Sequence, residues 1–422
     1  MILECLNRLL SNDCFRPTLS YSLPLSSKIR ASSRHLSEIS KNPCLFHNSC
    51  YKHAVSATEK PATQSLRGLS KEDLEAYVVS AGQKPYRAKQ ILEWLYQQRV
   101  EDIEEMSNLP APMRDKLASE FHINSMSHVE TSGSEDTTRK FLFRLQDGRY
   151  VETVFIPASK GLKGKQSDRK TICVSSQVGC AYGCKFCASG LAGFTRNLTA
   201  DEIIGQMMMV EKLTGESINN IVFMGMGEPL ANIKNLIKAL EIITGHWGLN
   251  IGARHITVST SGLAPMIKKL AEFPVPIRLA ISLHGATDDV RDLIMPVNKK
   301  WQIKELFDSL HYWRTFKKQK ISLEYILIKG VNDSKEQATI LAKRAKGINA
   351  KVNLIPYNTV EGLDWVRPSE EVCYGFRDIV ADAGINTTLR LEKGHDINAA
   401  CGQLRLKKET AEGIIPAPVK AG

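Results

Sequence analysis

Three cysteines lie close together in the middle of the chain, in the segment Cys180-Ala-Tyr-Gly-Cys184-Lys-Phe-Cys187. Three thiolates on a glycine-containing loop can wrap around a cubane iron–sulfur cluster and leave one of its irons open. Clusters that are fully ligated by cysteine transfer electrons, whereas an open iron can also bind a substrate. This spacing therefore favours a [4Fe-4S] cluster at Cys180, Cys184 and Cys187.

Zinc is the main alternative for this group, because structural zinc sites also use closely spaced cysteine pairs. Such a site needs a fourth ligand, and a second close pair usually supplies it. The sequence shows no such pair, since Cys173 comes too early in the run and Cys373 is solitary. Iron is favoured over zinc, and buried structural cysteines are the third interpretation.

A second motif, Met224-Gly225-Met226-Gly227-Glu228-Pro229, follows the apolar run at residues 219–223. Its glycines permit a close backbone approach, and Glu228 can accept hydrogen bonds from an ammonium group. Alone, the motif is a turn at the end of a strand. Downstream of the three cysteines, it predicts a cofactor site.

The elements that must position these residues are short β-like runs that alternate with helical segments. The runs are TICVSS, NNIVFMG, HITVST, RLAISLH, ISLEYILI, KVNLIPY and TTLRL, between residues 171 and 391. This alternation is typical of βα units around a parallel sheet. It predicts an α/β fold, a partial (β/α)6 barrel similar to a TIM barrel, with its site at the C-terminal ends of the strands.

The rest of the chain divides around this barrel at residues 161–394. Residues 66–125 have helical periodicity with a capping box at Ser70 and Asp73, and residues 136–160 read as a β-hairpin linker that turns at Asp147-Gly148. Glu152 falls inside the second strand of that hairpin. Residues 395–422 form a tail that carries Cys401.

Residues 1–60 differ in composition from the remainder, being rich in Ser, Arg and Lys and poor in acidic residues. This composition predicts an organelle transit peptide, for a chloroplast before a mitochondrion, because no amphipathic Arg-rich helix is evident. A disordered tail on a cytoplasmic protein is the alternative. No apolar run is long enough to span a membrane. The net charge of +11 points weakly towards a nucleic-acid partner.

Six segments together resemble the RlmN/Cfr family of radical S-adenosylmethionine (SAM) RNA methyltransferases, and most closely the RlmN branch, which makes 2-methyladenine. The resemblance runs from about residue 69 to residue 404. Its landmarks are CVSSQVGCAYGCKFC (173–187), FMGMGEPL (223–230), STSG (259–262), ISLH (281–284), NLIPYN (353–358) and DINAACGQL (396–404). The barrel would then be a radical SAM barrel.

The resemblance also implies roles for particular residues. The cluster ligands would be Cys180, Cys184 and Cys187, and the residues that hold SAM would be Gly227, Glu228, Ser259, Ser282, Leu283, His284 and Asn358. Cys401 would carry a methyl group, Cys173 would form a disulfide with it, and Glu152 would be the general base. Without the flanking motifs, Cys173 and Cys401 would be read as small buried hydrophobic residues.

The implied chemistry suits adenine C2, a carbon that is neither acidic nor nucleophilic. One SAM would methylate the Cys401 thiolate, and a second would be cleaved to a deoxyadenosyl radical that takes hydrogen from the S-methyl group. The resulting radical would add to the adenine ring. Glu152 would then remove the ring proton, and Cys173 would attack the Cys401 sulfur and release the methylated RNA.

The partners implied by the resemblance are rRNA, tRNA or both, and an electron donor such as ferredoxin or flavodoxin. The target adenine would have to leave its stack, and the chain is expected to act as a monomer away from membranes. Two alternatives stay open. A Cfr-like enzyme that methylates adenine C8 would share nearly every landmark, and a non-catalytic, metal-bearing RNA-binding protein would need no Cys401.

Three departures from the family pattern are present, and the first and last of them could flank the entrance to the site. Residues 393–396 read Lys-Gly-His-Asp where Arg-Gly-acidic-Asp is expected, Tyr182 replaces a more common Leu, and the loop at residues 159–170 is long. None removes a residue that is assigned to the chemistry. They bear on which RNA is preferred.

Overall fold

The computed structural model describes residues 64–133, 138–157, 168–191, 193–358, 363–390 and 403–415. All of them fall within the unit Glu59–Gly422. The predicted leader at residues 1–60, most of the loop at residues 159–170, and Cys401 lie outside the described residues. Within the described ranges, no helix has the length and apolar character that a membrane crossing requires.

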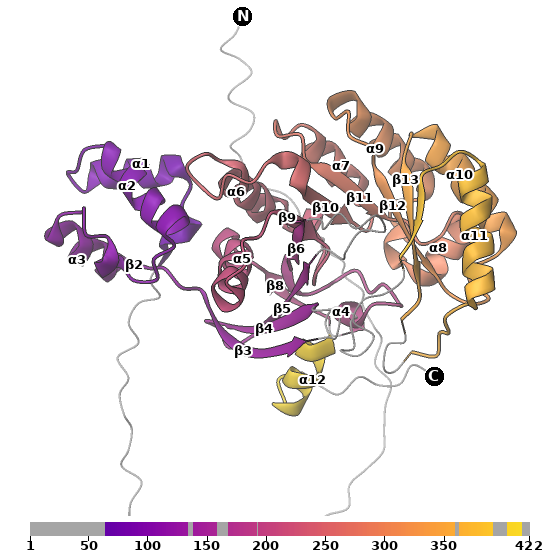
Figure 1. The fold of residues 1–422 in the computed structure, drawn as a ribbon, viewed down its shortest axis with the longest axis horizontal. Helices are drawn as coiled ribbons and strands as arrows, with labels where there is room; N and C mark the ends of the chain where they lie inside the picture. Colours follow the sequence, from indigo (N-terminus) through magenta and orange to yellow (C-terminus); the bar gives the residue numbers. More distant parts are fainter. Residues whose placement is uncertain are drawn as a thin grey trace, which may run out of the picture. The chain divides into compact units, whose positions relative to one another are not determined.

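A helical module occupies residues 64–123 (Figure 1). Its elements are β1 (Gln64–Ser65), α1 (Lys71–Ser80), α2 (Tyr86–Glu93), α3 (Ala111–Glu120) and β2 (Phe121–His122). The capping box predicted at the start of α1 is confirmed. The Ser70 hydroxyl accepts a bond from the Asp73 N–H at 3.0 Å, and the Asp73 carboxylate accepts one from the Ser70 N–H at 3.3 Å.

One ten-stranded sheet forms the centre of the molecule (Figure 1). Its strands, in spatial order, are β14 (Thr387–Leu389), β13 (Lys351–Pro356), β12 (Ser322–Leu327), β11 (Arg278–Ser282), β10 (Ile256–Thr260), β9 (Asn220–Phe223), β6 (Lys170–Cys173), β5 (Tyr150–Pro157), β4 (Arg139–Leu145) and β3 (Met126–Gly133). From β14 to β6, neighbouring strands are parallel. Each of the seven predicted runs contains one of these strands, so the predicted partial barrel is confirmed.

The predicted hairpin is formed by β4 and β5, which pair in antiparallel fashion. Gly148 has a φ of 80° in the turn, and the Arg149 N–H bonds the Asp147 carboxylate at 3.1 Å. Since β5 also pairs with β6, the hairpin extends the barrel sheet. β3 adds a further strand that the sequence did not predict, because most of its side chains are exposed and show no apolar alternation.

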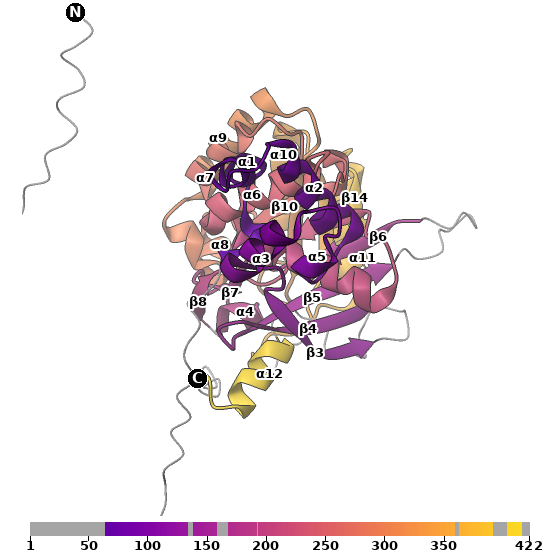
Figure 2. The same cartoon turned by 90° about the vertical axis from the view of Figure 1, so that its left-hand side faces the viewer.

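Helices follow the parallel strands and cover the outer face of the sheet (Figure 1). They are α5 (Ala200–Thr214), α6 (Ile233–Thr244), α7 (Ala264–Ala271), α8 (Asp288–Ile294), α9 (Ile303–Phe316), α10 (Lys335–Gly347) and α11 (Glu370–Asp382). They are the helical segments that the sequence predicted between the β-like runs. Near the antiparallel strands lies α12 (Gln403–Ala411), which packs against β5 (Figure 2).

Alternation along the parallel strands gives the sheet one apolar and one polar face. The outward positions carry fully buried aliphatic residues, for example Val258, Ile281 and Leu323. The inward positions carry polar residues. Ser282 of β11, Glu324 of β12 and Asn353 of β13 are matched across the three strands, so their side chains lie on this same face. Burial of the apolar face stabilises the barrel, and the polar inner face is left for a ligand.

Candidate active site

The three clustered cysteines lie on a loop that begins where a short β-ribbon ends. The ribbon consists of β7 (Gln177–Gly179) and β8 (Phe194–Asn197), and α4 (Ala188–Leu191) follows the loop. The Cys180 N–H donates to the Gly193 carbonyl at 2.8 Å, and the Lys185 N–H donates to the Ile294 carbonyl at 3.0 Å. These bonds fix the loop to the ribbon on one side and to the end of α8 on the other.

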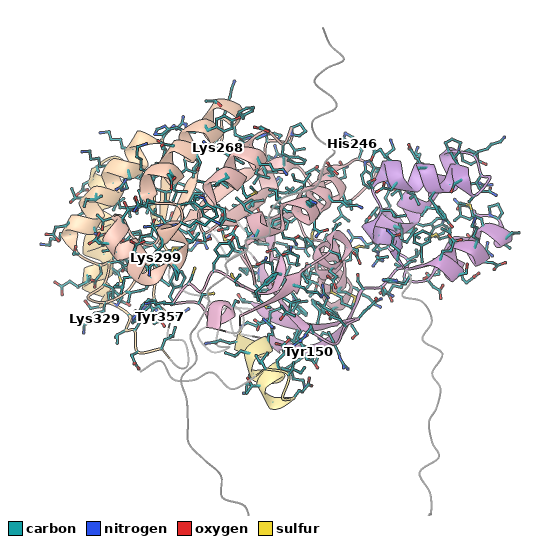
Figure 3. The ribbon with its side chains drawn as sticks, turned by 180° about the vertical axis from the view of Figure 1, so that it is seen from behind. Tyr150, His246, Lys268, Lys299, Lys329 and Tyr357 are labelled. Atoms are coloured by element: carbon teal, nitrogen blue, oxygen red, sulfur yellow. The ribbon has the colours of Figure 1, made fainter. Side chains whose placement is uncertain are left out.

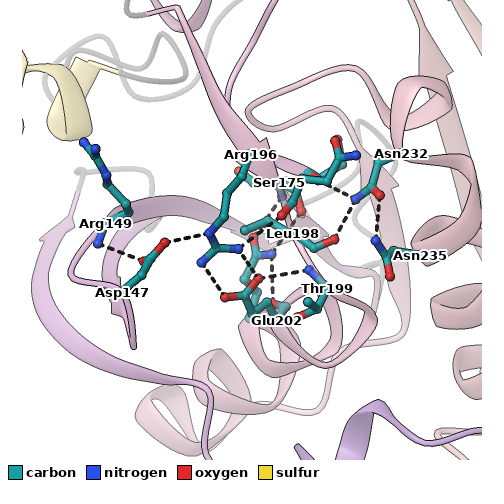
Figure 4. A network of polar contacts seen from close by, with 12 residues as sticks. Asp147, Arg149, Ser175, Arg196, Leu198, Thr199, Glu202, Asn232 and Asn235 are labelled. Atoms are coloured by element: carbon teal, nitrogen blue, oxygen red, sulfur yellow. Dashed lines mark hydrogen bonds and ion pairs between the residues drawn. The ribbon is translucent and has the colours of Figure 1, made fainter. Parts of the chain in front are cut away.

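A polar network braces the base of this loop (Figure 4). The Arg196 guanidinium makes two bonds of 2.8 Å to the Glu202 carboxylate and one of 2.6 Å to Asp147. Asn232 donates to the carbonyls of Leu198 and Ser176, at 2.7 and 2.9 Å. The network therefore joins the ribbon to the hairpin turn and to α5, and it limits how far the cysteine loop can shift.

Eight of the predicted site residues line one cavity of about 260 Å³ at the C-terminal ends of the strands. They are Cys180, Cys184, Cys187, Gly227, Glu228, Ser259, Ser282 and His284. Leu283 does not line the cavity; it is buried, and its N–H donates to the Glu324 carbonyl at 3.0 Å. Asn358 is half-buried just beyond β13 and also stays outside the lining.

The donor set suits a cluster, because three cysteine side chains open onto one cavity. The three sulfurs share the cavity, yet no three Cys, His, Asp or Glu side chains in the described part of the chain converge on one point as ligands of a single ion. A zinc ion requires four ligands within about 2.0–2.3 Å of one centre, whereas each thiolate of a cubane binds a different iron. The shared cavity of Cys180, Cys184 and Cys187 therefore allows them to hold a cubane cluster.

Burial affects the cysteines strongly before any metal binds. It raises the pKa of the Cys180 thiol to about 12, and it raises the pKa of the Cys184 thiol as well, with the nearby charge of Cys187 as a second cause. These thiols are therefore protonated at neutral pH in the metal-free protein. Because iron binds the thiolate, loading of a cluster must release protons.

Glu228 joins the ends of two strands beneath the cavity. Its carboxylate accepts a bond from the Leu230 N–H at 3.0 Å and another from the Ser261 N–H at 2.7 Å. Burial raises the pKa of Glu228, and the backbone bonds oppose that shift. A carboxylate has about four acceptor positions, so Glu228 can still accept bonds from an ammonium group in the cavity.

His284 is a neutral hydrogen-bond donor at the cavity wall. Its Nδ1 accepts the Ile326 N–H at 3.0 Å, which leaves the ring proton on Nε2. Burial, and after it the charge of Arg291, lowers the pKa of His284 to about 3. Phe186 packs edge-on against the ring at 4.7 Å. The imidazole can therefore donate to a ligand without gaining charge at neutral pH.

Arg291 is a supporting residue that the sequence did not reveal. Its buried guanidinium donates to the Ser282 carbonyl at 2.9 Å and also to the carbonyls of Ser261 and Leu283. Burial lowers the pKa of Arg291 to about 10, so it remains charged at neutral pH. It holds the ends of β10 and β11 together. Its place in an otherwise ordinary helical segment gave no signal, because the carbonyls it binds are distant in sequence.

Glu152 and Cys173 lie on the inner face of the sheet, outside the cavity lining. Val154 is matched with Cys173 across β5 and β6, and Glu152, two residues before Val154, projects from the same face. Glu152 is 2% exposed and lies 3.6 Å from the Nζ of Lys140. The structure thus places the two residues on neighbouring strands of one face. No disulfide is formed among the described residues.

The start of α12 lies against Glu152. The Arg405 N–H, in the first turn of α12, donates to the Glu152 Oε1 at 2.6 Å. A carboxylate at this end of a helix is favoured by the helix dipole. Cys401 is outside the described residues, and four residues of chain span at most about 14 Å. Its predicted role is therefore compatible with this contact and stays a prediction.

Buried contacts attach α12 to the sheet. Figure 3 shows Tyr150 beside this helix, where its hydroxyl bonds the Glu412 carboxylate at 2.8 Å. Glu409 accepts the Tyr150 N–H at 3.4 Å and, within α12, forms an almost completely buried ion pair of 2.8 Å with Arg405. Replacing one partner of such a pair would leave an uncompensated buried charge. The helix is therefore a fixed part of the fold on this side of the sheet.

Comparison with known proteins places these features in a family. Residues 64–123 match the family described as the ribosomal RNA large subunit methyltransferase N-terminal domain, and residues 174–341 match the radical SAM superfamily. The chain is 56% identical over 349 residues to "Probable dual-specificity RNA methyltransferase RlmN" of Akkermansia muciniphila, an alignment that covers 83% of this chain and 97% of that protein.

Two further relatives agree. A protein of Geobacillus kaustophilus that is also named "Probable dual-specificity RNA methyltransferase RlmN" is 43% identical over 364 residues. The alignment covers 86% of this chain and 97% of that protein. The crystal structure of a radical SAM methyltransferase from Sphaerobacter thermophilus superposes with a TM-score of 0.75 at 40% identity, covering 81% and 98% of the two chains. The predicted resemblance is confirmed: the chain belongs to the RlmN family of radical SAM RNA methyltransferases.

Proposed function

We propose that the chain methylates carbon C2 of an adenine in large-subunit rRNA, tRNA or both, through a methylated Cys401 and with two SAM molecules per methylation. The observation that carries this proposal is the single cavity in which Cys180, Cys184 and Cys187 meet Glu228 and the other predicted SAM residues. Family membership supports the same chemistry, because the relatives are named dual-specificity RNA methyltransferases.

Each group of residues has a separate task in this proposal. A [4Fe-4S] cluster bound by the three cysteines supplies the electron that cleaves SAM. Glu228 accepts bonds from the SAM ammonium group, and His284 donates from Nε2 without changing its charge. Glu152 takes the adenine ring proton, with Lys140 close enough to stabilise the carboxylate. Cys173 displaces the RNA from Cys401 by forming a disulfide.

The proposed partners extend this assignment. The helical module at residues 66–125 contacts the RNA, in keeping with the family match at residues 64–123 and the net charge of +11. A ferredoxin or flavodoxin supplies electrons, and the chain acts as a monomer. Residues 1–60 direct it to the chloroplast. A fusion of residues 1–60 to a fluorescent protein tests that destination, and fluorescence in mitochondria or cytoplasm would contradict it.

Nucleoside analysis of rRNA and tRNA from cells that lack the protein tests the reaction. We expect 2-methyladenosine to disappear from at least one of these RNAs and to return with the wild-type gene. A gene that encodes Cys401→Ala should not restore it. Unchanged 2-methyladenosine together with lost 8-methyladenosine would instead assign the Cfr-like reaction. Unchanged levels of both would leave the metal-bearing RNA-binding protein as the function.

A further inference from the structure

Glu324, in the middle of β12, faces the cavity but was not among the predicted site residues. Its backbone carbonyl accepts the N–H groups of Leu283 and His284, at 3.0 and 3.3 Å. Its Cα is matched with that of Ser282 on β11. Its side chain projects from the polar inner face and lines the same cavity as Ser282 and His284. Glu324 therefore supports the predicted SAM segment with its backbone and reaches the same space with its carboxylate.

The charges of Arg390 and Lys351 act on this carboxylate, but only one of its oxygens has a hydrogen-bond partner. Oε1 accepts a bond from the Asn353 amide at 2.8 Å, whereas Oε2 has no hydrogen-bond partner in the structure. The residue is 4% exposed, so water does not freely compensate. An unsatisfied acceptor at such a site costs about 1–3 kcal/mol, and more when the group is charged. A buried oxygen without a donor, on a side chain that lines a cavity, indicates that a ligand supplies the missing donor.

The other groups of the cavity indicate which part of SAM can donate a hydrogen bond to the Glu324 Oε2. The SAM carboxylate would be repelled by Glu324, and the ammonium group is assigned to Glu228 near the cysteine loop. The ribose of SAM presents two adjacent hydroxyl groups. An acidic side chain in a strand-lined site is a common partner for ribose hydroxyls, as in dinucleotide-binding folds. The serine hydroxyls of Ser259 and Ser282 line the same wall and suit a polyhydroxylated ligand.

We propose that Glu324 is a positioning residue for SAM, and that its Oε2 accepts hydrogen bonds from the ribose hydroxyl groups. This inference rests on the proposed function, because it requires SAM in the cavity. Asn353 fixes the carboxylate by holding Oε1, so the orientation of Oε2 exists before SAM binds. Because the Glu324 carbonyl also holds Leu283 and His284, the ribose contact is built on the same segment as the imidazole donor.

Binding of SAM analogues to the cluster-loaded protein tests the proposal without RNA. The ligands are SAM, 2′-deoxy-SAM and 3′-deoxy-SAM, and the proteins are wild type, Glu324→Ala and Glu324→Gln. Dissociation constants come from anaerobic equilibrium dialysis, with the electron paramagnetic resonance change of the reduced cluster as a second readout. Glu371→Ala, which removes an exposed glutamate on α11, is the matched control.

We expect the wild-type protein to bind SAM about 10- to 100-fold more tightly than at least one deoxy analogue, as a charged hydrogen bond predicts. Glu324→Ala should have an affinity for SAM that is lower by a similar factor. Its affinity for the same deoxy analogue should be almost that of the wild type. Glu324→Gln keeps the volume of the side chain and should show reduced discrimination between SAM and the analogue. Glu371→Ala should behave as the wild type.

Two results would overturn the proposal. One is an unchanged affinity for SAM in Glu324→Ala. The other is an equal loss of affinity for SAM and for both analogues in Glu324→Ala, which would indicate a purely structural role. If Glu324→Ala does not retain its cluster, Glu324→Gln decides, and discrimination equal to that of the wild type would contradict the ribose contact. A wild-type protein that binds no SAM would remove the proposed function itself, so the two failures are distinguishable.

Discussion

The two sides of the inner face are built in different ways. On the side of β9 to β13, the predicted SAM residues come from short segments at the ends of neighbouring parallel strands. On the side of β4 to β6, Glu152 depends on Lys140 and on the backbone of Arg405, which is 253 residues away in sequence. The first side follows from the parallel strand order, whereas the second requires the C-terminal helix to return to the sheet. We call them the cofactor side and the transfer side.

Replacing a cluster ligand should have the largest effect, because both sides need the cluster. We expect Cys184→Ser to lose most of its iron and all detectable methylation, since serine is a poor substitute for thiolate. Iron analysis after anaerobic reconstitution and nucleoside analysis of treated RNA measure these losses. Cys373→Ser, which alters a buried cysteine on α11, is the control and should retain iron. Full iron in Cys184→Ser, or stoichiometric zinc in the wild type, would contradict the cluster.

Removing the proposed base should separate the two sides. We expect Glu152→Gln to slow RNA methylation by about 10²- to 10⁴-fold, the usual contribution of general base catalysis. Iron content and SAM affinity should stay at wild-type values, because Glu152 does not line the cavity. Single-turnover methylation assays and equilibrium dialysis provide the two measurements. Methylation at the wild-type rate would show that Glu152 is not the general base. A loss of SAM affinity as large as the loss of methylation rate would show that the cofactor side and the transfer side do not act separately.

Acid should destabilise the cofactor side through His284. Burial lowers its pKa to about 3 in the folded protein, so the unfolded chain binds the additional proton as the pH falls below about 6.5. The contribution of His284 to the free energy of unfolding is therefore fully present above pH 6.5 and is lost as the pH falls towards 3. We expect His284 to account for about 2 kcal/mol of the loss in free energy of unfolding between pH 7.5 and pH 5.

Urea unfolding of the iron-free protein at the two pH values measures this contribution. His284→Asn retains an acceptor for the Ile326 N–H but does not titrate, so its stability should depend less on pH than that of the wild type. An identical pH dependence in both proteins would show that His284 is not the group responsible.

The smallest effect is expected at the base of the cysteine loop. Arg196→Lys keeps the charge but loses the two-bond contact with Glu202. Because the Arg196 side chain is 30% exposed, we expect the free energy of unfolding to fall by only about 1 kcal/mol. Chemical denaturation of the cluster-free protein measures it. A loss of iron from Arg196→Lys at wild-type stability would show that the Arg196 network acts on the cluster directly. A much larger fall in the free energy of unfolding would contradict the expected small effect.

The sequence predicted the parts of the fold that depend on local patterns. Alternating β-like and helical runs predicted all seven parallel strands, and the turn at Asp147-Gly148 predicted the hairpin. β3 was missed because its exposed residues carry no apolar alternation. That strand is specified by pairing with β4, which no local pattern of its own reveals.

The site shows the same limit. Eight residues from recognised segments meet in the cavity, whereas Arg291, Lys140 and Glu324 were missed. Arg291 acts on carbonyls from two strands, and Lys140 meets Glu152 through cross-strand pairing. One signal for Glu324 was available. It is the only charged residue in the run ISLEYILI, at a position that alternation places opposite the apolar face.

The chemical state of Cys401 in protein with Cys173→Ala tests the methyl-carrier role most directly. Without Cys173, the RNA cannot be displaced from Cys401 by disulfide formation. Mass spectrometry of protein produced in cells should therefore find Cys401 methylated or joined to an RNA fragment, and the additional replacement Cys401→Ala should abolish the adduct. An unmodified Cys401 in a cluster-loaded Cys173→Ala protein would contradict transfer through this cysteine.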